Sequence, residues 1–217
     1  MNKLLRTAFI LSLITIFYNI MEGLISVYFG AGDETLALFG FGADSFVEVI
    51  SGIGIAHMIF RMKYSKVQTR DAFEKTALKI TGTVFFILTA GLVLGSVLNF
   101  INDVKPATTI PGIVIAVISI ATMYWLMTTK LNVGKSLKSD AIIADANCTK
   151  TCFYLSFILL ASSGLYELFN IAYFDIIGSL GIAYFAFSEG REAFEKVRSG
   201  NLACNCEDDC ETETVKS

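Results

Sequence analysis

The sequence predicts an all-α fold: a polytopic membrane protein with six transmembrane helices and both termini in the cytoplasm. Three observations carry this prediction. Of the 217 residues 54% are hydrophobic and only 17% are charged, and the mean hydropathy of +0.61 exceeds that of soluble domains. The apolar residues form six runs, each close to the roughly 20 residues that cross a bilayer. Basic residues gather in alternate connections between these runs.

Six segments are expected to span the membrane. The runs at 109–129 and 168–188 carry almost no charge and are the plainest candidates. The first run follows basic residues, as the apolar part of a signal peptide does. It is too long for one and lacks a clear small-residue cleavage site, so we expect a retained helix. The expected spans are 8–29, 35–60, 76–101, 109–129, 140–165 and 168–188.

Charge in the connections sets the expected topology. Connections on one side contain acidic residues and Asn with the single Lys105, whereas those on the other side are rich in Lys and Arg. Because basic connections stay in the cytoplasm, both termini are expected inside. We therefore expect an integral, multi-pass protein of the plasma membrane. The basic residues are Arg61, Lys63, Lys66, Arg70, Lys130, Lys135, Lys138, Arg191, Lys196 and Arg198.

Three regions are expected along the chain. Residues 1–188 form the transmembrane domain, and residues 189–200 form a short amphipathic helix at the cytoplasmic surface. Residues 201–217 are expected to be a disordered acidic tail that contains Cys204, Cys206 and Cys210. These thiols could capture a soft cation or simply lie in solvent. Three thiols without His do not complete a structural zinc site, so the sequence favours neither reading.

Two carboxylates lie one helical turn apart inside the second apolar run. Asp44 and Glu48 are spaced i, i+4, so a helix places both on one face, near the middle of the membrane. Ionisable side chains at that depth are costly, and two like charges are worse unless a cation or protons lie between them. A metal or proton site is the favoured interpretation. The alternative is a carboxylate pair neutralised by protons or by one Lys.

The fifth apolar run supplies a counterpart. Cys148 and Cys152 are again spaced i, i+4, with Asp145 on the same face and at a similar depth. A lone buried Cys is usually just a small hydrophobic residue, but a thiol pair opposite a carboxylate pair could surround one ion. Lys150 lies on another face of this helix, and pairing with Glu22 is one option for it. The predicted metal ligands are Asp44, Glu48, Cys148 and Cys152.

The first apolar run carries a polar stripe that should face the protein interior. Thr15, Asn19, Glu22 and Ser26 recur at spacings that place them on one helical face. We expect Asn19 and Ser26 to hydrogen-bond neighbouring helices, while for Glu22 a functional role and a structural ion pair are equally open. In the predicted site, Asn19, Glu22 and Asp145 would orient the ligands or carry protons.

The spans and their carboxylates resemble the cation diffusion facilitator superfamily of metal exporters, in particular its short six-span members without a cytoplasmic domain. The likeness covers most of residues 8–195. Family members carry a carboxylate pair in the second span, matched here by Asp44 and Glu48. The sequence at 188–193 also resembles the end of span six in the short members.

The fifth span both matches this family and departs from it. Family members carry Ala-Asp followed by His-x-x-x-Asp, and here Ala144-Asp145 is followed by Cys148 and Cys152 in the His and Asp positions. Two thiols in place of His and Asp would change the metal preference. The residues from 189 onward are too few for the dimerisation domain that most members carry in the cytoplasm.

The resemblance and the ligand pattern imply a transporter, not an enzyme. We expect it to export a divalent transition-metal ion, zinc, cadmium or a softer ion such as mercury, by proton antiport. The metal would be cargo with no permanently bound cofactor, and the other partners would be protons and the bilayer. A homodimer is compatible with the sequence, and no nucleic-acid signature is present. The alternatives are a membrane metal receptor that does not transport and, less favoured, a membrane thiol-redox protein with Cys148 and Cys152 as its disulfide.

Overall fold

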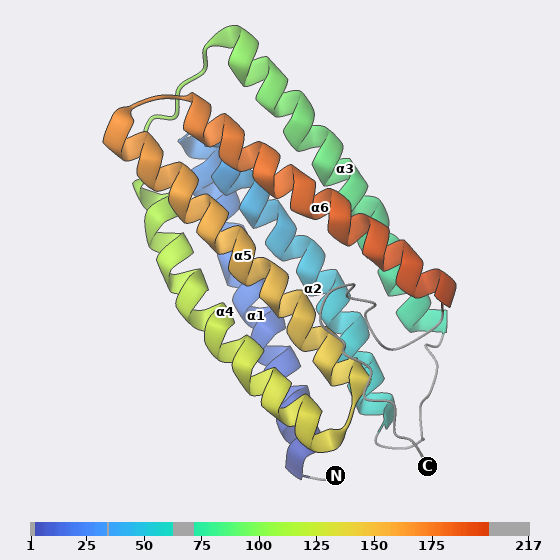
Figure 1. Cartoon of the computed structure of the whole chain (residues 1–217). Helices are drawn as coiled ribbons and strands as arrows, with labels where there is room; N and C mark the ends of the chain where they lie inside the picture. Colours follow the sequence, from blue (N-terminus) through green and yellow to red (C-terminus); the bar gives the residue numbers. More distant parts are fainter. Residues whose placement is uncertain (1–2, 34, 63–71, 200–217) are drawn as a thin grey trace, which may run out of the picture.

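In the computed structural model, which describes residues 3–33, 35–62 and 72–199, every regular element is an α-helix (Figure 1). Five of these helices are long and apolar enough to cross a membrane. The exception, α6, carries charged residues along its last turns. The predicted all-α membrane fold is confirmed. The helices are α1 (Lys3–Gly32), α2 (Leu36–Met62), α3 (Ala72–Asn102), α4 (Ile110–Leu137), α5 (Asp140–Phe169) and α6 (Tyr173–Ser199).

The helices form an antiparallel bundle in two parts. α1, α2, α4 and α5 make a four-helix group, and α3 pairs with α6 along its edge (Figure 1). α2 connects the two parts. It packs against α1 and α5 within the four-helix group and against α3 and α6 of the pair. α1 begins and α6 ends at the same end of the bundle, which we call the terminal end. The other end is called the opposite end.

Carboxylates close two helix N-termini at the opposite end. The backbone N–H groups of Leu36 and Ala37 donate to Asp175 at 2.9 and 3.2 Å, and that of Thr109 donates to Glu167 at 2.6 Å. A helix N-terminus leaves its first N–H groups unpaired, and an acidic side chain satisfies them and complements the helix dipole. These contacts tie α6 to α2 and α5 to α4.

α1 and α2 approach each other closely at Gly42. A Cβ at this position would meet Cβ of Ser26 at 2.7 Å and the backbone nitrogen of Val27 at 2.8 Å. Small residues at such crossings let two helix backbones pack together within a membrane. The crossing lies one half-turn before Asp44, so it fixes where the carboxylates of α2 sit relative to α1.

The charged ends of α4 and α6 differ from the expectation. α6 runs unbroken to Ser199, so residues 189–199 continue the sixth helix and do not form a separate surface helix. α4 runs to Leu137, which places Lys130 inside a helix instead of in a connection, with 1% of its surface exposed. Charged residues in both segments are paired: Lys130 of α4 with Asp145 of α5, and Lys196 with Glu192 one turn earlier on α6. The tail at 201–217 lies outside the described residues.

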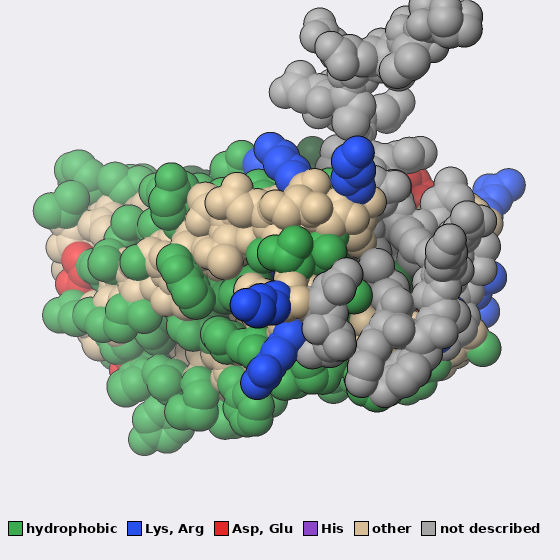
Figure 2. Space-filling view, turned by 90° about the horizontal axis from the view of Figure 1, so that it is seen from below, with side chains coloured by type: hydrophobic (Ala, Val, Ile, Leu, Met, Phe, Trp, Pro, Cys, Tyr) green, Lys and Arg blue, Asp and Glu red, His purple; other side chains and the backbone are tan. Residues whose placement is uncertain are grey.

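The outer surface shows how the bundle would meet a membrane. Figure 2 shows the molecule from below, relative to the view of Figure 1. Hydrophobic side chains cover much of this face, and Lys and Arg side chains gather toward one half of it. Large apolar side chains such as Ile87, Leu94 and Ile101 on α3 are more than 60% exposed, as residues in contact with lipid would be. The described basic residues near the terminal end include Arg6, Arg61, Lys135, Lys138, Arg191 and Arg198.

Candidate functional site

Glu48 is the point at which three helices meet. The Sγ of Cys152 on α5 donates to Oε1 of Glu48 on α2, and Nδ2 of Asn19 on α1 donates to the other oxygen, Oε2, at 2.8 Å. Cys152 and Asn19 are 3% and 0% exposed, so these contacts lie in the interior. The structure thus brings one carboxylate and one thiol of the predicted ligand set into direct contact, with Asn19 beside them.

The other two predicted ligands lie one helical turn to either side. Asp44, 3% exposed, precedes Glu48 on α2 and lies within electrostatic range of Glu48, Glu22 and Glu189. Cys148 precedes Cys152 on α5, lies within electrostatic range of Glu48, and has its Sγ 3.9 Å from Nζ of Lys196. Among the described residues, no three His, Cys, Asp or Glu side chains converge closely enough to hold a metal ion. The four predicted ligands share one region without forming a closed coordination shell.

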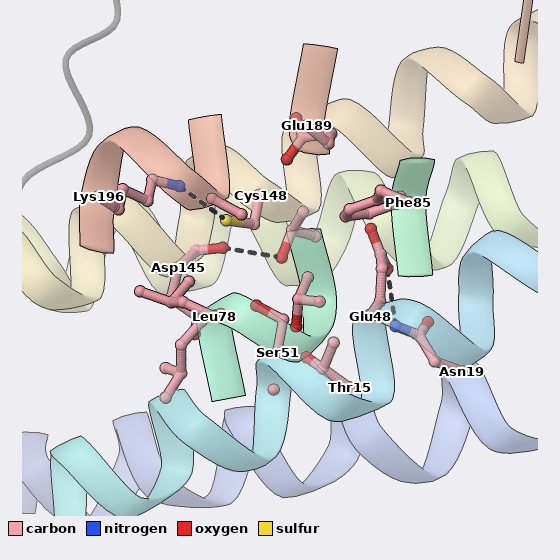
Figure 3. Close-up of a pocket in the computed structure, with 15 residues that line it drawn as sticks. Thr15, Asn19, Glu48, Ser51, Leu78, Phe85, Asp145, Cys148, Glu189 and Lys196 are labelled. Carbon is pink, nitrogen blue, oxygen red and sulfur yellow. Dashed lines mark hydrogen bonds between the residues drawn. The ribbon is translucent and has the colours of Figure 1, made fainter. Parts of the chain in front are cut away.

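A cavity of about 40 Å³ adjoins Glu48 (Figure 3). This volume is enough for a water molecule or a small ion. Its lining includes Glu48, Asp145, Cys148, Glu189 and Lys196, so charged and thiol groups from α2, α5 and α6 face one space.

The cavity extends from Glu48 toward the terminal end. Lining residues such as Ser51 and Ile55 on α2 and Ala193 on α6 lie on the terminal side of Glu48 along their helices. On the other side, an apolar cluster that includes Phe41 and Leu159 fills the space between the helices. The region around Glu48 therefore adjoins a cavity that holds charged groups on its terminal side, and an apolar cluster lies beyond Asp44 toward the opposite end.

Glu22 is held by neutral partners. The hydroxyl groups of Tyr18 and Ser45 donate to its two carboxylate oxygens at 2.9 and 3.1 Å. Lys150 is exposed, with its ammonium 5.8 Å from the ring centroid of Tyr154, so the suggested pairing of Lys150 with Glu22 is wrong. A lysine side chain is long enough to place its ammonium group in water, which costs less free energy than burying the charge without an acidic partner. The sequence left open whether Glu22 has a functional role or forms a structural ion pair. Among the described residues it forms no ion pair.

Asp145 belongs to a buried ion pair. Nζ of Lys130 donates to Oδ1 of Asp145 at 2.9 Å and to the hydroxyl oxygen of Thr149 at 3.0 Å. The side chains of Lys130 and Asp145 are 1% and 7% exposed. Asp145 also lines the cavity, three residues before Cys148 on α5. The ion pair therefore joins α4 to α5 beside the cavity.

Comparison with known proteins assigns the chain to a family. A family model described as the cation efflux transmembrane domain matches residues 8–199, nearly the whole helical part. The chain belongs to the cation efflux family. Comparison with curated proteins gives no match. The family resemblance stated from the sequence is thereby confirmed, and the chain is a membrane cation transporter by family.

In this cation efflux protein three charged residues of the site were not predicted from the sequence. Lys130 was placed in a connection, and Glu189 and Lys196 were placed at the membrane surface. Glu189 instead lines the cavity and accepts a hydrogen bond from the hydroxyl of Thr151 at 2.9 Å. A signal for the α6 pair was present, because residues 189, 193 and 196 recur at i, i+4 and i+7 and so share one helical face.

Groups of opposite character meet in this region. The Cys152 thiol of α5 contacts the Glu48 carboxylate of α2 in the interior of the bundle. Two ammonium groups, Lys130 and Lys196, lie at the terminal side of the same region and offset part of its negative charge.

Proposed function

We propose that the protein exports a divalent transition-metal ion, zinc, cadmium or a softer ion such as mercury, from the cytoplasm in exchange for protons. The observation that carries the proposal is the hydrogen bond from the Cys152 thiol to the Glu48 carboxylate. It joins a soft and a hard metal ligand across two helices of a cation efflux protein.

Ligand chemistry favours soft and borderline ions. Carboxylate oxygens from Asp44 and Glu48 with thiolates from Cys148 and Cys152 make a mixed tetrahedral set. Zinc and cadmium accept such a set, whereas magnesium, calcium and manganese prefer oxygen ligands alone. Because the four groups do not converge in this structure, binding requires a small movement of α2 against α5. Transport sites are expected to close around their cargo in this way.

The same contact supports proton exchange. A thiol that donates a hydrogen bond carries a proton, and a thiol or carboxyl group binds metal only after losing its proton. Metal and protons therefore compete for Cys152 and Glu48. Asn19 would orient Glu48, and Glu22 and Asp145 would take up or pass protons.

The shape of the bundle supports outward transport by alternating access. The cavity reaches Glu48 from the terminal end, where basic residues gather, and such residues lie in the cytoplasm in most membrane proteins. We infer that both termini are cytoplasmic and that this conformation faces inward. Export would then need the apolar cluster around Phe41 to open as the cavity closes.

Metal flux in sealed vesicles tests the proposal. Purified protein is reconstituted, and uptake is measured for zinc, cadmium, mercury, manganese and magnesium with wild type and Glu48→Gln. We expect zinc, cadmium or mercury to move, manganese and magnesium not to, and Glu48→Gln to be inactive. Metal binding without flux would instead make the protein a receptor. Flux unchanged in Glu48→Gln would place the site elsewhere.

A further inference from the structure

Lys196 places an ammonium group inside the cavity beside a predicted metal ligand. Its side chain is 8% exposed, its Nζ lies 2.7 Å from Oε1 of Glu192, and it lies 3.9 Å from Sγ of Cys148 (Figure 3). Lys196 lines the cavity together with Glu48 and Glu189. A positive charge thus lies in the cavity that adjoins Glu48, on the terminal side of this carboxylate.

We propose that Lys196 is the inner gate of the transport path: its ammonium takes the place of a cation beside Cys148 and must withdraw before a metal ion can pass. The inference rests on the proposed function, since it assigns a gate to that same site. Two positive charges a few ångströms apart repel each other strongly away from bulk water. A divalent ion and the Lys196 ammonium therefore exclude each other from this part of the cavity.

The surroundings of Lys196 allow such a movement. Glu192, one turn earlier on α6, holds the ammonium inward and is itself 30% exposed, so the pair lies at the boundary between cavity and surface. A lysine carries its charge on a flexible four-carbon chain and can redirect it to the aqueous surface. Lys130 cannot do this, because it is held by both Asp145 and Thr149 and is 1% exposed.

The alternative is that Lys196 only pairs with Glu192 to stabilise the end of α6. The two readings differ in what a small cation experiences on its way to Cys148. A gating ammonium slows cations relative to neutral molecules of the same size. In a purely structural ion pair the charges of Lys196 and Glu192 cancel, so removing both charges together leaves the two rates in the same proportion.

Chemical modification of Cys148 in the reconstituted full-length protein separates these readings. The probes are 2-aminoethyl and 2-hydroxyethyl methanethiosulfonate, which differ in charge but hardly in size. In each case the thiolate sulfur attacks the reagent, forms a mixed disulfide and releases methanesulfinate. Peptide mass spectrometry gives the rate at Cys148 apart from the other cysteines. The measured quantity is the rate with the cationic aminoethyl reagent divided by the rate with the neutral hydroxyethyl reagent. A change in the reactivity of the thiol affects both rates equally and cancels in this ratio.

We expect this ratio to rise about tenfold in Lys196→Gln and also in Lys196→Gln combined with Glu192→Gln, in which the repelling charge is gone and no unpaired carboxylate is left to attract the cation. Lys196→Arg keeps the charge and should keep the ratio, and so should Lys135→Met, which removes an exposed lysine of the same end. An unchanged ratio in the double variant would overturn the gate. So would a Cys148 that neither reagent modifies in any variant. The measurement needs no transport, so it can fail or succeed independently of metal export.

Discussion

Glu48 accepts hydrogen bonds from two other helices at once, α1 and α5. Asn19 and Cys152 occupy its two oxygens, and neither partner carries a positive charge. A buried carboxylate held only by neutral groups is expensive unless a proton or a metal ion shares the site. Retaining Glu48 in this position is therefore better explained by cation handling than by packing.

Glu48→Gln should abolish transport while preserving the fold. The amide has the size of the carboxyl group, and its oxygen can still accept from one of the two donors, Asn19 or Cys152. It binds transition metals poorly and cannot exchange a proton. We expect metal flux to fall about 100-fold or more, with the thermal unfolding temperature little changed. Glu195→Gln, on the exposed side of α6, is the matched control and should transport as wild type does. Loss of flux in both variants would point to a general effect of charge.

The two cysteines should set which metal is carried. Cys148→His combined with Cys152→Asp replaces soft sulfur by harder nitrogen and oxygen, so transport should shift from cadmium or mercury toward zinc. The zinc-to-cadmium flux ratio in vesicles measures the shift. If serine at both positions leaves metal affinity and this ratio unchanged, the cysteines are packing residues. Asp145 would then be the remaining acidic group on that face of α5.

At the scale of elements, α4 and α5 are joined by the Lys130–Asp145 pair. Removing one partner leaves the other charge buried and uncompensated, at a cost of about 3–5 kcal/mol in comparable pairs, whereas replacing both by apolar groups costs far less. We expect Lys130→Met to lower the free energy of unfolding by this amount. Lys130→Met with Asp145→Leu should recover most of the loss. Thermal and chemical unfolding in detergent measure the free energy of unfolding of each variant. If the loss in the double variant equals the sum of the losses in the two single variants, the pairing is contradicted.

The crossing of α1 and α2 depends on Gly42. A methyl group there meets the backbone of α1, so Gly42→Ala should push the helices apart and cost about 1–3 kcal/mol of stability. Metal flux should fall as well, because the shift moves Glu48 away from Asn19. Gly91→Ala on α3, where a Cβ meets nothing within 4 Å, is the control and should be neutral. Equal effects of the two changes would show that the crossing is not tightly fitted.

At the scale of the whole molecule, hydropathy predicted the six helices because a span must satisfy its backbone internally, whatever its neighbours are. Spacing predicted which face of α2 and α5 carries the carboxylates and thiols. It could not reveal Lys130 as a buried group, because its partner Asp145 lies on another helix. For Lys196 the spacing did carry a signal, the helical face that it shares with Glu189. Charge alone placed both lysines at the surface, whereas the packing of α4 and α6 buries both.

The most direct test of proton-coupled metal export is proton movement driven by metal. Reconstituted vesicles trap a pH-sensitive dye, and zinc or cadmium is added outside with no initial pH gradient. If metal displaces the protons held at Glu48 and Cys152, uptake should make the lumen more alkaline as protons leave. Glu48→Gln should abolish both the metal uptake and the change in luminal pH. Metal uptake by the wild-type protein with no change in luminal pH would contradict proton exchange at this site.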